Sequence, residues 1–353
     1  MKRVVVAMSG GVDSSVAAAL LREQGYEVIG MMLRLWSEPG KEDSNRCCTP
    51  DSMALARRVA ARLGIPFYVI DAKDVFRNTV VEAFLEGYRL GRTPNPCLVC
   101  NRRVRWEFLL QHALALGAEA MATGHYARLR RTEDGRYELL RAVDRAKDQS
   151  YVLHVLTQEK LARALFPIGE YTKDQVRALA EKFGLPSAKR PDSQDLCFLA
   201  GEDYRAFLHR NAPEILQPGP IVDTQGRRLG THQGLAAYTI GQRKGLGIAA
   251  PYPLYVIAKD VNTNTLIVGP AEALGQREAQ VANITWTSGL VPEKGFRAEV
   301  KIRYTAREVP AWVEPRGADQ AKVTFDVPLR DITPGQAAVF YQDEIVIGGG
   351  IIE

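Results

Sequence analysis

A short apolar run, Val4 to Met8, leads directly into the segment SGGVDSS at positions 9–15, and a helical pattern follows from Ser14 to Glu23. A run of this kind is typical of a strand buried on both faces of a sheet. The same order recurs, with an apolar run at Val28–Leu33 and a helical pattern at Asp51–Leu63. Strands that alternate with helices predict an α/β fold with a doubly wound, mainly parallel sheet.

The rest of the first half continues this pattern. We expect a strand at Phe67–Ile70, helices near Val75–Tyr88 and Val104–Leu116, and a strand at Ala120–Thr123. The segment Thr172–Gln175 has the form of a capping box and predicts a helix that stops at Gly184. A shorter helix is expected at Asp203–His209.

Beyond about Ile221 the pattern changes to β structure. Leu254–Ala258 and Thr265–Val268 flank a turn-rich connection and predict a hairpin. Further short strands are expected at residues 297–304, 311–314, 321–327, 337–341 and 345–350. We therefore predict three domains, namely a catalytic α/β domain at 1–200, a small central domain at 201–270 and a C-terminal β-barrel at 271–353.

Composition indicates a globular protein and helps to predict its cellular location. The chain has 353 residues, of which 46% are hydrophobic and 25% charged, an ordinary balance for two or three globular domains. No apolar run approaches the ~18 residues of a membrane span, and the run before Ser9 is too short for a secretory signal. We therefore expect a cytoplasmic protein with no membrane partner. The net charge of +5 permits a nucleic acid as partner but does not require one.

The segment at 9–15 has the chemistry of a phosphate-binding loop. Gly10 and Gly11 let the main chain approach a phosphate closely, and the N-terminus of the following helix presents free N–H groups. Ser9 and Ser14 add hydroxyl donors. Asp13 by itself would repel a phosphate, so its position suits a bridging Mg²⁺. The alternative is a simple glycine turn before a capped helix.

Cysteines form the second candidate site. The chain has five, an odd and sparse set that argues against a disulfide scaffold. Cys97 and Cys100 precede a helical segment, and a helix N-terminus with nearby arginines favours the thiolate. Cys197 lies far away in sequence. Sulfur transfer needs one thiol to carry a persulfide and another to release the sulfur, so two cysteines brought together by folding would meet that need.

Each cysteine also has a simpler interpretation. Cys197 stands between Leu196 and Phe198, where a small buried side chain would fit. A C-x-x-C pair alone more often indicates metal binding or redox chemistry. Cys47 and Cys48 are adjacent and have no assigned role.

Six motifs in a fixed order resemble a known family. They are SGGVDSS at 9–15, TPNPCLVCN at 93–101, ATGHYAR at 122–128, KDQSYVL at 147–153, DSQDLCF at 192–198 and YTIGQRKGLGI at 238–248. The first resembles the pyrophosphate loop of the N-type ATP pyrophosphatases. The whole set resembles the bacterial tRNA-specific 2-thiouridylases over nearly the entire chain.

The resemblance implies an enzyme, a tRNA-uridine 2-sulfurtransferase. With ATP and Mg²⁺ it would adenylate the C2 oxygen of the tRNA wobble uridine, U34. Sulfur from a cysteine persulfide would then replace that oxygen, with release of AMP and pyrophosphate. The sulfur would come from a persulfide donor protein, either a cysteine desulfurase or a sulfur-relay protein.

The resemblance also implies roles for individual residues. Cys100 matches the nucleophile of the family, and Cys197 matches the carrier of the persulfide. ATP would be held by Ala7, Met8, Ser9, Gly10, Gly11, Val12, Asp13, Ser14, Leu33 and Gly124. The tRNA and its target base would contact Asn95, Pro96, Cys97, His125, Lys147, Asp148, Gln149, Arg303, Tyr304 and Gln336.

One position departs from the family pattern and leaves alternatives open. Many relatives carry Asp at the position of Cys97, so proton transfer goes elsewhere in this chain or Cys97 has another role. Cys97, Cys100 and Cys197 would alternatively ligate an iron–sulfur cluster. The rival functions are another synthetase on the same fold, which has no use for both Cys100 and Cys197, and a tRNA-binding protein without catalysis.

Overall fold

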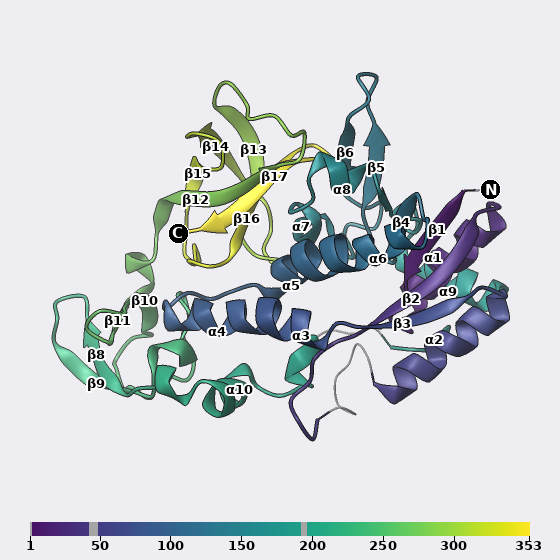
Figure 1. Ribbon diagram of the computed structural model, residues 1–353. Helices are drawn as coiled ribbons and strands as arrows, with labels where there is room; N and C mark the ends of the chain where they lie inside the picture. Colours follow the sequence, from purple (N-terminus) through teal and green to yellow (C-terminus); the bar gives the residue numbers. More distant parts are fainter. Residues whose placement is uncertain (1, 42–48, 192–195) are drawn as a thin grey trace.

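Five parallel strands form the N-terminal sheet, in the spatial order β3–β2–β1–β4–β7. They are β1 (Arg3–Ala7), β2 (Glu27–Arg34), β3 (Phe67–Asp71), β4 (Ala120–Thr123) and β7 (Ala164–Leu165). Figure 1 labels β1 to β4. The computed structural model describes residues 2–41, 49–191 and 196–353. The first four strands lie where the sequence predicts them. The fifth has two residues, too few for a visible pattern.

Helices cover both faces of this sheet, because successive side chains of a strand point to opposite faces. Val4 and Val6 pack with α1 (Val12–Glu23), α2 (Pro50–Leu63) and α9 (Lys173–Lys182). Val5 packs on the other face, against the helical stretch that ends in α6 (Leu110–Ala115). The predicted doubly wound α/β fold is therefore confirmed.

The helix on the second face begins earlier than its apolar pattern predicts. It starts at Pro96 rather than at Val104 and runs as α5 (Pro96–Val99), a stretch of wider π-type turns (Cys100–Leu109) and α6. Asn95 caps it by accepting a hydrogen bond from the Cys97 N–H, 3.1 Å away. Periodicity does not reveal these first turns because they carry cysteines and charged residues.

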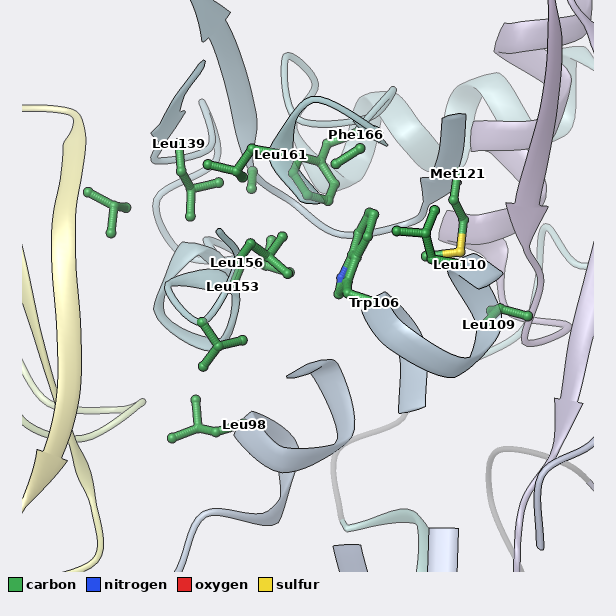
Figure 2. Packing of buried hydrophobic residues seen from close by; sticks show 14 of the residues in the cluster. Leu98, Trp106, Leu109, Leu110, Met121, Leu139, Leu153, Leu156, Leu161 and Phe166 are labelled. Atoms are coloured by element: carbon green, nitrogen blue, oxygen red, sulfur yellow. The ribbon is translucent and has the colours of Figure 1, made fainter. Parts of the chain in front are cut away.

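The same helix is anchored in an apolar core, shown in Figure 2. Trp106 is fully buried there and meets the ring of Phe166 edge to face, with 5.7 Å between ring centroids. Leu98 from α5 and Leu153 from α7 (Ser150–Leu153) belong to the same cluster (Figure 2). The helix that carries Cys97 and Cys100 is thus held in place by the core.

A second helical arm lies beside it (Figure 1). It consists of α3 (Lys73–Phe76), a π-type stretch (Arg77–Val81) and α4 (Glu82–Arg89). Phe84 of α4 contacts Phe198, with 5.2 Å between ring centroids, and Phe198 contacts Phe207 of α10 (Tyr204–Asn211) at 5.3 Å. Burial of Phe198 fixes the position of its neighbour Cys197.

An unpredicted hairpin joins the N-terminal domain to the barrel. Its strands β5 (Arg128–Arg131) and β6 (Tyr137–Leu140) are antiparallel, and Leu140 pairs with Ile345 of β17. Arg128 forms an ion pair with Glu344, the residue before β17. Figure 1 shows the hairpin beside the barrel. The short helix α8 (Gln158–Leu161) follows in the chain.

Four strands form the sheet of the central region, in the order β10–β11–β8–β9. They are β8 (Gly219–Asp223), β9 (Arg228–His232), β10 (Tyr255–Asp260) and β11 (Thr265–Gly269). The antiparallel pairing of β10 with β11 confirms the predicted hairpin.

The C-terminal strands close into a six-stranded antiparallel barrel because β12 pairs with both β15 and β17. The barrel consists of β12 (Gln276–Trp286), β13 (Phe296–Lys301), β14 (Val309–Pro315), β15 (Ala321–Leu329), β16 (Ala337–Gln342) and β17 (Ile345–Ile352). The predicted barrel is confirmed, although β12 escapes the sequence pattern. The domain limits at 200 and 270 stay a prediction. No helix in the described part of the chain combines the length and apolar character needed to cross a bilayer.

Candidate active site at the ends of the parallel strands

The loop between β1 and α1 requires a glycine at position 10. Gly10 has φ +74°, a conformation that side chains with a Cβ rarely adopt. A Cβ at this position would stand 2.4 Å from the Ser52 carbonyl oxygen. Arg190 donates a hydrogen bond to the Gly10 carbonyl at 3.1 Å and a second one to the Ser52 hydroxyl. The loop is therefore fixed against the start of α2.

The N-terminus of α1 is available to an anion. Gly11 is its N-cap, and no side chain caps the helix there. The first N–H groups of such a helix lack partners within the helix and point along its positive dipole end. The hydroxyl of Ser14 donates to the Gly11 carbonyl at 3.3 Å and accepts from the Ser9 N–H at 3.2 Å. Ser14 thus holds the main chain of the loop in shape through its hydroxyl.

Gly124 lies where the strand order reverses, between β1 and β4. A Cβ on Gly124 would stand 2.5 Å from the Ser14 nitrogen, so the two loops touch. Such a switch point, beyond the carboxyl ends of the strands, is where open α/β sheets bind ligands. Ala7 is the last residue of β1, Leu33 is the last but one residue of the neighbouring β2, and both are partly buried. Met8 and Val12 have buried side chains, so they would offer ATP their main chain.

Asp13 is held by two residues that the sequence analysis does not identify. Lys173 places its Nζ 2.8 and 3.0 Å from the two carboxylate oxygens, and the Tyr126 hydroxyl donates to Oδ1 at 2.9 Å. The side chains of Lys173 and Asp13 are 10% and 31% exposed, so water screens this ion pair only in part. Lys173 lies within the predicted capping box, and Tyr126 lies within the motif at 122–128. Neither sequence pattern predicts that these side chains contact Asp13.

Cys100 and Cys197 come together on one apolar cluster. Both are partly buried and pack against the group that contains Phe84, Phe198 and Met32. Met32 belongs to β2, so the cluster reaches the carboxyl end of the parallel sheet. Residues 192–195 of the Cys197 motif lie outside the described residues, as do Cys47 and Cys48.

The arginines near Cys100 have other partners as well. Arg102 donates to the Thr285 hydroxyl at 3.1 Å, and Arg103 pairs with Glu107 at 3.2 Å. Arg105 lies 3.0 Å from His125. Cys97 lies in the first turn of α5, and Cys100 follows one turn later, where the π-type stretch begins.

A second group of predicted residues gathers between the barrel and the start of the Cys97 helix. Gln336 donates from Nε2 to the Thr93 carbonyl at 2.8 Å. The Tyr151 hydroxyl donates to the Ala337 carbonyl at 3.1 Å, and its ring contacts that of Tyr304 at 6.0 Å between centroids. Residues from four distant parts of the sequence thus meet here, with Tyr151 and Ala337 fully buried and Tyr304 exposed above them.

Tyr304 is the exposed member of this group, with 43% of the residue accessible to solvent. Burial of its hydroxyl raises its pKa, and the nearby charges of Asp148 and Cys97 raise it further. Lys147 and Gln149 act in the opposite direction and lower this pKa. Tyr304 therefore adjoins Cys97 and the loop that carries residues 147–149.

Three predicted tRNA contacts have buried side chains in this arrangement. His125 is 6% exposed, with Thr123 and Arg105 at its two ring nitrogens. Burial, and then Arg105, hold its pKa well below the usual range, so the ring is neutral. Asp148 is 7% exposed and accepts hydrogen bonds from Ala142 and Ser150. Pro96 is buried as well. Contact of these side chains with tRNA stays a prediction.

Arg303 connects the barrel to the central sheet region. It donates to the Ile240 carbonyl at 3.3 Å and to the Thr333 hydroxyl, and it pairs with Asp331 at 3.7 Å. The predicted contact residues Asn95, Cys97, Lys147, Gln149, Arg303, Tyr304 and Gln336 all lie at the junction of the domains.

The structure does not support the iron–sulfur alternative. Within residues 2–41, 49–191 and 196–353, no three His, Cys, Asp or Glu side chains are grouped so that they could hold a metal ion. Cys97, Cys100 and Cys197 therefore do not form a ligand set in this arrangement.

Fold and site together define an α/β enzyme with a phosphate loop, followed by two β regions. Three family models match the chain in this order. They are the tRNA methyl transferase HUP domain at residues 2–201, the tRNA methyl transferase PRC-barrel domain at 205–270 and the aminomethyltransferase beta-barrel domain at 276–352.

Close relatives specify the family. The tRNA-specific 2-thiouridylase MnmA of Roseiflexus castenholzii is 50% identical over an alignment of 370 residues, gaps included. The alignment covers 100% of this chain and 99% of that protein. The proteins of the same name from Chloroflexus aggregans and Magnetococcus marinus are each 51% identical, covering 100% and 99% of this chain and 98% and 99% of theirs. The chain belongs to the tRNA-specific 2-thiouridylase family, which confirms the predicted enzyme class, a tRNA sulfurtransferase that uses ATP.

Proposed function

We propose that the enzyme adenylates the C2 oxygen of U34 in tRNA with ATP held on the loop at 9–15, and that Cys100 and Cys197 deliver the sulfur. One observation carries the proposal. Two cysteines from distant parts of the chain pack on a single apolar cluster that also contains Met32 from the nucleotide end of the sheet. Neither rival function requires that arrangement.

The chemistry requires activation because an oxygen on uracil C2 is a poor leaving group. Attack of this oxygen on the α-phosphorus of ATP forms a new O–P bond and expels pyrophosphate. Sulfur from a Cys197 persulfide then forms a bond to C2, and the C–O bond breaks with departure of AMP. Cys100 displaces the transferred sulfur from Cys197 and forms a disulfide with it. A thiol reductant reopens this disulfide before the next turnover.

Mg²⁺ fits the geometry of Asp13. The carboxylate has about four lone-pair positions, and the bonds from Lys173 and Tyr126 occupy three of them. Oδ2 retains one for a cation. A Mg²⁺ ion commonly uses one or two carboxylates together with substrate phosphates and waters. When bound, it would neutralise phosphate charge beside a carboxylate that otherwise repels ATP.

The surface around Tyr304 fits the tRNA. A base must leave its stack to reach an enclosed site, and aromatic rings stack on everted bases. Tyr304 presents an exposed ring next to Cys97, while Lys147 and Arg303 add positive charge. We assign the target base to the space between this surface and the strand ends.

The sulfur source and cellular location complete the proposal. A persulfide on Cys197 requires a donor protein that itself carries a persulfide, such as a cysteine desulfurase or a sulfur-relay protein. The thiols that carry the reaction must remain reduced between turnovers, and tRNA is a cytoplasmic substrate. We therefore place the enzyme in the cytoplasm.

The test combines the protein with ATP, Mg²⁺, unmodified tRNA and a cysteine desulfurase supplied with cysteine, and it detects 2-thiouridine by nucleoside mass spectrometry. Cys100→Ser and Cys197→Ser are each expected to abolish the product while tRNA-dependent AMP release continues. Cys48→Ser is the matched control and should retain activity. Thiolation that persists in both site variants would overturn the assignment of the thiols.

The same assay separates the rival functions. A tRNA-binding protein without catalysis would release no AMP in the presence of tRNA. Another synthetase on this fold would form its product with both cysteines replaced. The iron content of protein purified without oxygen tests the cluster independently, and we expect no stoichiometric iron.

A further inference from the structure

Two residues of the N-terminal domain each touch both Asp13 and the loop at residues 144–149. Lys173 and Tyr126 reach the Asp13 carboxylate through their side chains. Both reach the loop through their main chains. Because the two sets of contacts use different atoms, each residue connects the nucleotide loop to the loop at 144–149.

Lys173 holds the beginning of that loop. Its main-chain N–H donates to Asp144 Oδ2 at 2.9 Å. The other carboxylate oxygen of Asp144 accepts from the N–H groups of Ala146 and Lys147, at 3.1 and 3.3 Å. A shift of Lys173 therefore moves the turn from which Lys147 projects.

Tyr126 holds the end of the loop. Its carbonyl accepts from the Gln149 N–H at 2.8 Å, and its N–H donates to Gln149 Oε1 at 3.0 Å. These two bonds fix both the main chain and the side chain of Gln149. Lys147 and Gln149 in turn lie close enough to Tyr304 to affect its hydroxyl, so the loop adjoins the barrel surface assigned to tRNA.

We propose that Lys173 and Tyr126 are positioning residues that couple ATP binding to tRNA binding. The inference rests on the proposed function, because it places ATP at Asp13 and tRNA at residues 147–149 and Tyr304. A nucleotide that fixes Asp13 also fixes both connections. The loop at 144–149 then loses less conformational entropy when tRNA binds. The coupling is reciprocal, so tRNA strengthens ATP binding by the same factor.

The burial of the contacts supports this coupling. Lys173 is almost entirely buried and forms its ion pair with Asp13 at the edge of the core, near the ring of Tyr126. Ion pairs between exposed side chains contribute little because water and salt screen them, whereas partly buried pairs are screened much less. A change in the position or charge of Asp13 therefore changes the interaction energy of Lys173.

The test measures the Kd of unmodified tRNA with and without α,β-methylene ATP, in which the bond broken by adenylation cannot be cleaved. In the wild-type protein the analogue is expected to tighten tRNA binding by at least about fivefold, the lower end of usual couplings. Lys173→Met and Tyr126→Phe remove the side-chain contacts with Asp13 and keep the main-chain contacts with the loop. Each substitution should reduce the factor by which the analogue tightens tRNA binding, and the double variant should bring this factor close to one.

Matched controls exist on the same part of the fold. Lys182→Met removes a lysine of α9 that pairs with Glu23, and Tyr171→Phe removes a hydroxyl just before α9. Both should retain the wild-type factor. Hydrogen exchange adds a direct reading of the loop, because the analogue should slow exchange at residues 146–149 in the wild type and not in the double variant.

Two results would overturn the inference while leaving the proposed function intact. One is that the analogue changes the Kd of tRNA by the same factor in the wild type and the double variant. The other is that the analogue leaves the Kd of tRNA unchanged in the wild type, although analogue and tRNA both bind. If Lys173→Met does not fold, Tyr126→Phe alone decides, since it loses a single hydroxyl. A wild-type protein that binds neither ligand refutes the proposed function and the inference together.

Discussion

Gln336 in the barrel donates a hydrogen bond from Nε2 to the carbonyl of Thr93 in the N-terminal domain, at 2.8 Å. The Thr93 N–H donates in return to the carbonyl of Pro334, also at 2.8 Å. The segment that leads into the Cys97 helix is therefore bound to the barrel by two hydrogen bonds, in which Thr93 is once the acceptor and once the donor. These bonds hold the barrel surface assigned to tRNA in a fixed position relative to the helix that carries Cys97 and Cys100.

Replacing Gln336 tests this fastening. Gln336→Ala leaves the Thr93 carbonyl without its side-chain donor and should lower the free energy of unfolding by about 1 kcal/mol. The KM for tRNA should rise while the KM for ATP stays the same, because Gln336 does not touch the nucleotide loop. Gln342→Ala, which removes a barrel hydrogen bond to the Arg297 carbonyl, is the control. Equal effects of both variants on the KM for tRNA would refute the idea.

Gly10→Ala should abolish ATP binding. The substitution forces a side chain into a conformation with φ +74° and places its Cβ against the Ser52 carbonyl. We expect a loss of stability of about 1–3 kcal/mol and no measurable affinity for α,β-methylene ATP by calorimetry. Gly25→Ala has the same kind of φ, +84°, with no atom within 4 Å of the new Cβ, so it isolates the strain. Normal ATP affinity in Gly10→Ala would contradict the loop assignment.

Asp13→Ala should abolish AMP formation and leave tRNA binding without nucleotide intact. Loss of the carboxylate removes the proposed cation ligand and leaves the Lys173 ammonium without this partner in a mostly buried position. A cost of up to about 3 kcal/mol in unfolding free energy follows. AMP release by thin-layer chromatography and tRNA binding on filters measure the two effects. Asp51→Ala, in the first turn of α2, is the control; loss of tRNA binding alone in Asp13→Ala would count against its assigned role.

His154 should make the protein sensitive to acid. Burial lowers its pKa to about 4, although the hydrogen bond from Nδ1 to the Tyr151 carbonyl acts against this. An unfolded histidine titrates near 6.5, so the unfolded state binds the extra proton first as the pH falls. The titration of His154 therefore leaves the free energy of unfolding unchanged above about pH 6.5. As the pH falls from there toward 4, the free energy of unfolding decreases by at most ~1.4 kcal/mol per pH unit.

Denaturant unfolding at a series of pH values checks this prediction. His154→Gln should flatten the decline between about pH 6.5 and about pH 4. His209→Gln, at an exposed position near the end of α10, should leave the decline unchanged. An identical decline in the wild type and in His154→Gln would show that other groups are responsible.

Local patterns predict the first four strands of the N-terminal sheet correctly because each is a short run of mostly apolar residues. The capping box at Thr172 is present as predicted, with both reciprocal hydrogen bonds. The longest barrel strand, β12, escapes detection for a physical reason. Asn283 within it has φ +54°, and the register shifts between Ala282 and Thr285, so the simple alternation of side chains is broken.

The amino-acid sequence by itself determined the loop chemistry at 9–15, the alternation of strands and helices, and the family. These depend on neighbours in the chain, whose spacing sets which side chains share a face. Only the tertiary structure decided that Lys173 and Tyr126 hold Asp13, that Cys100 and Cys197 share a cluster, and that Gln336 secures Thr93. Contacts between residues so far apart arise from the packing of whole elements, which no local pattern encodes.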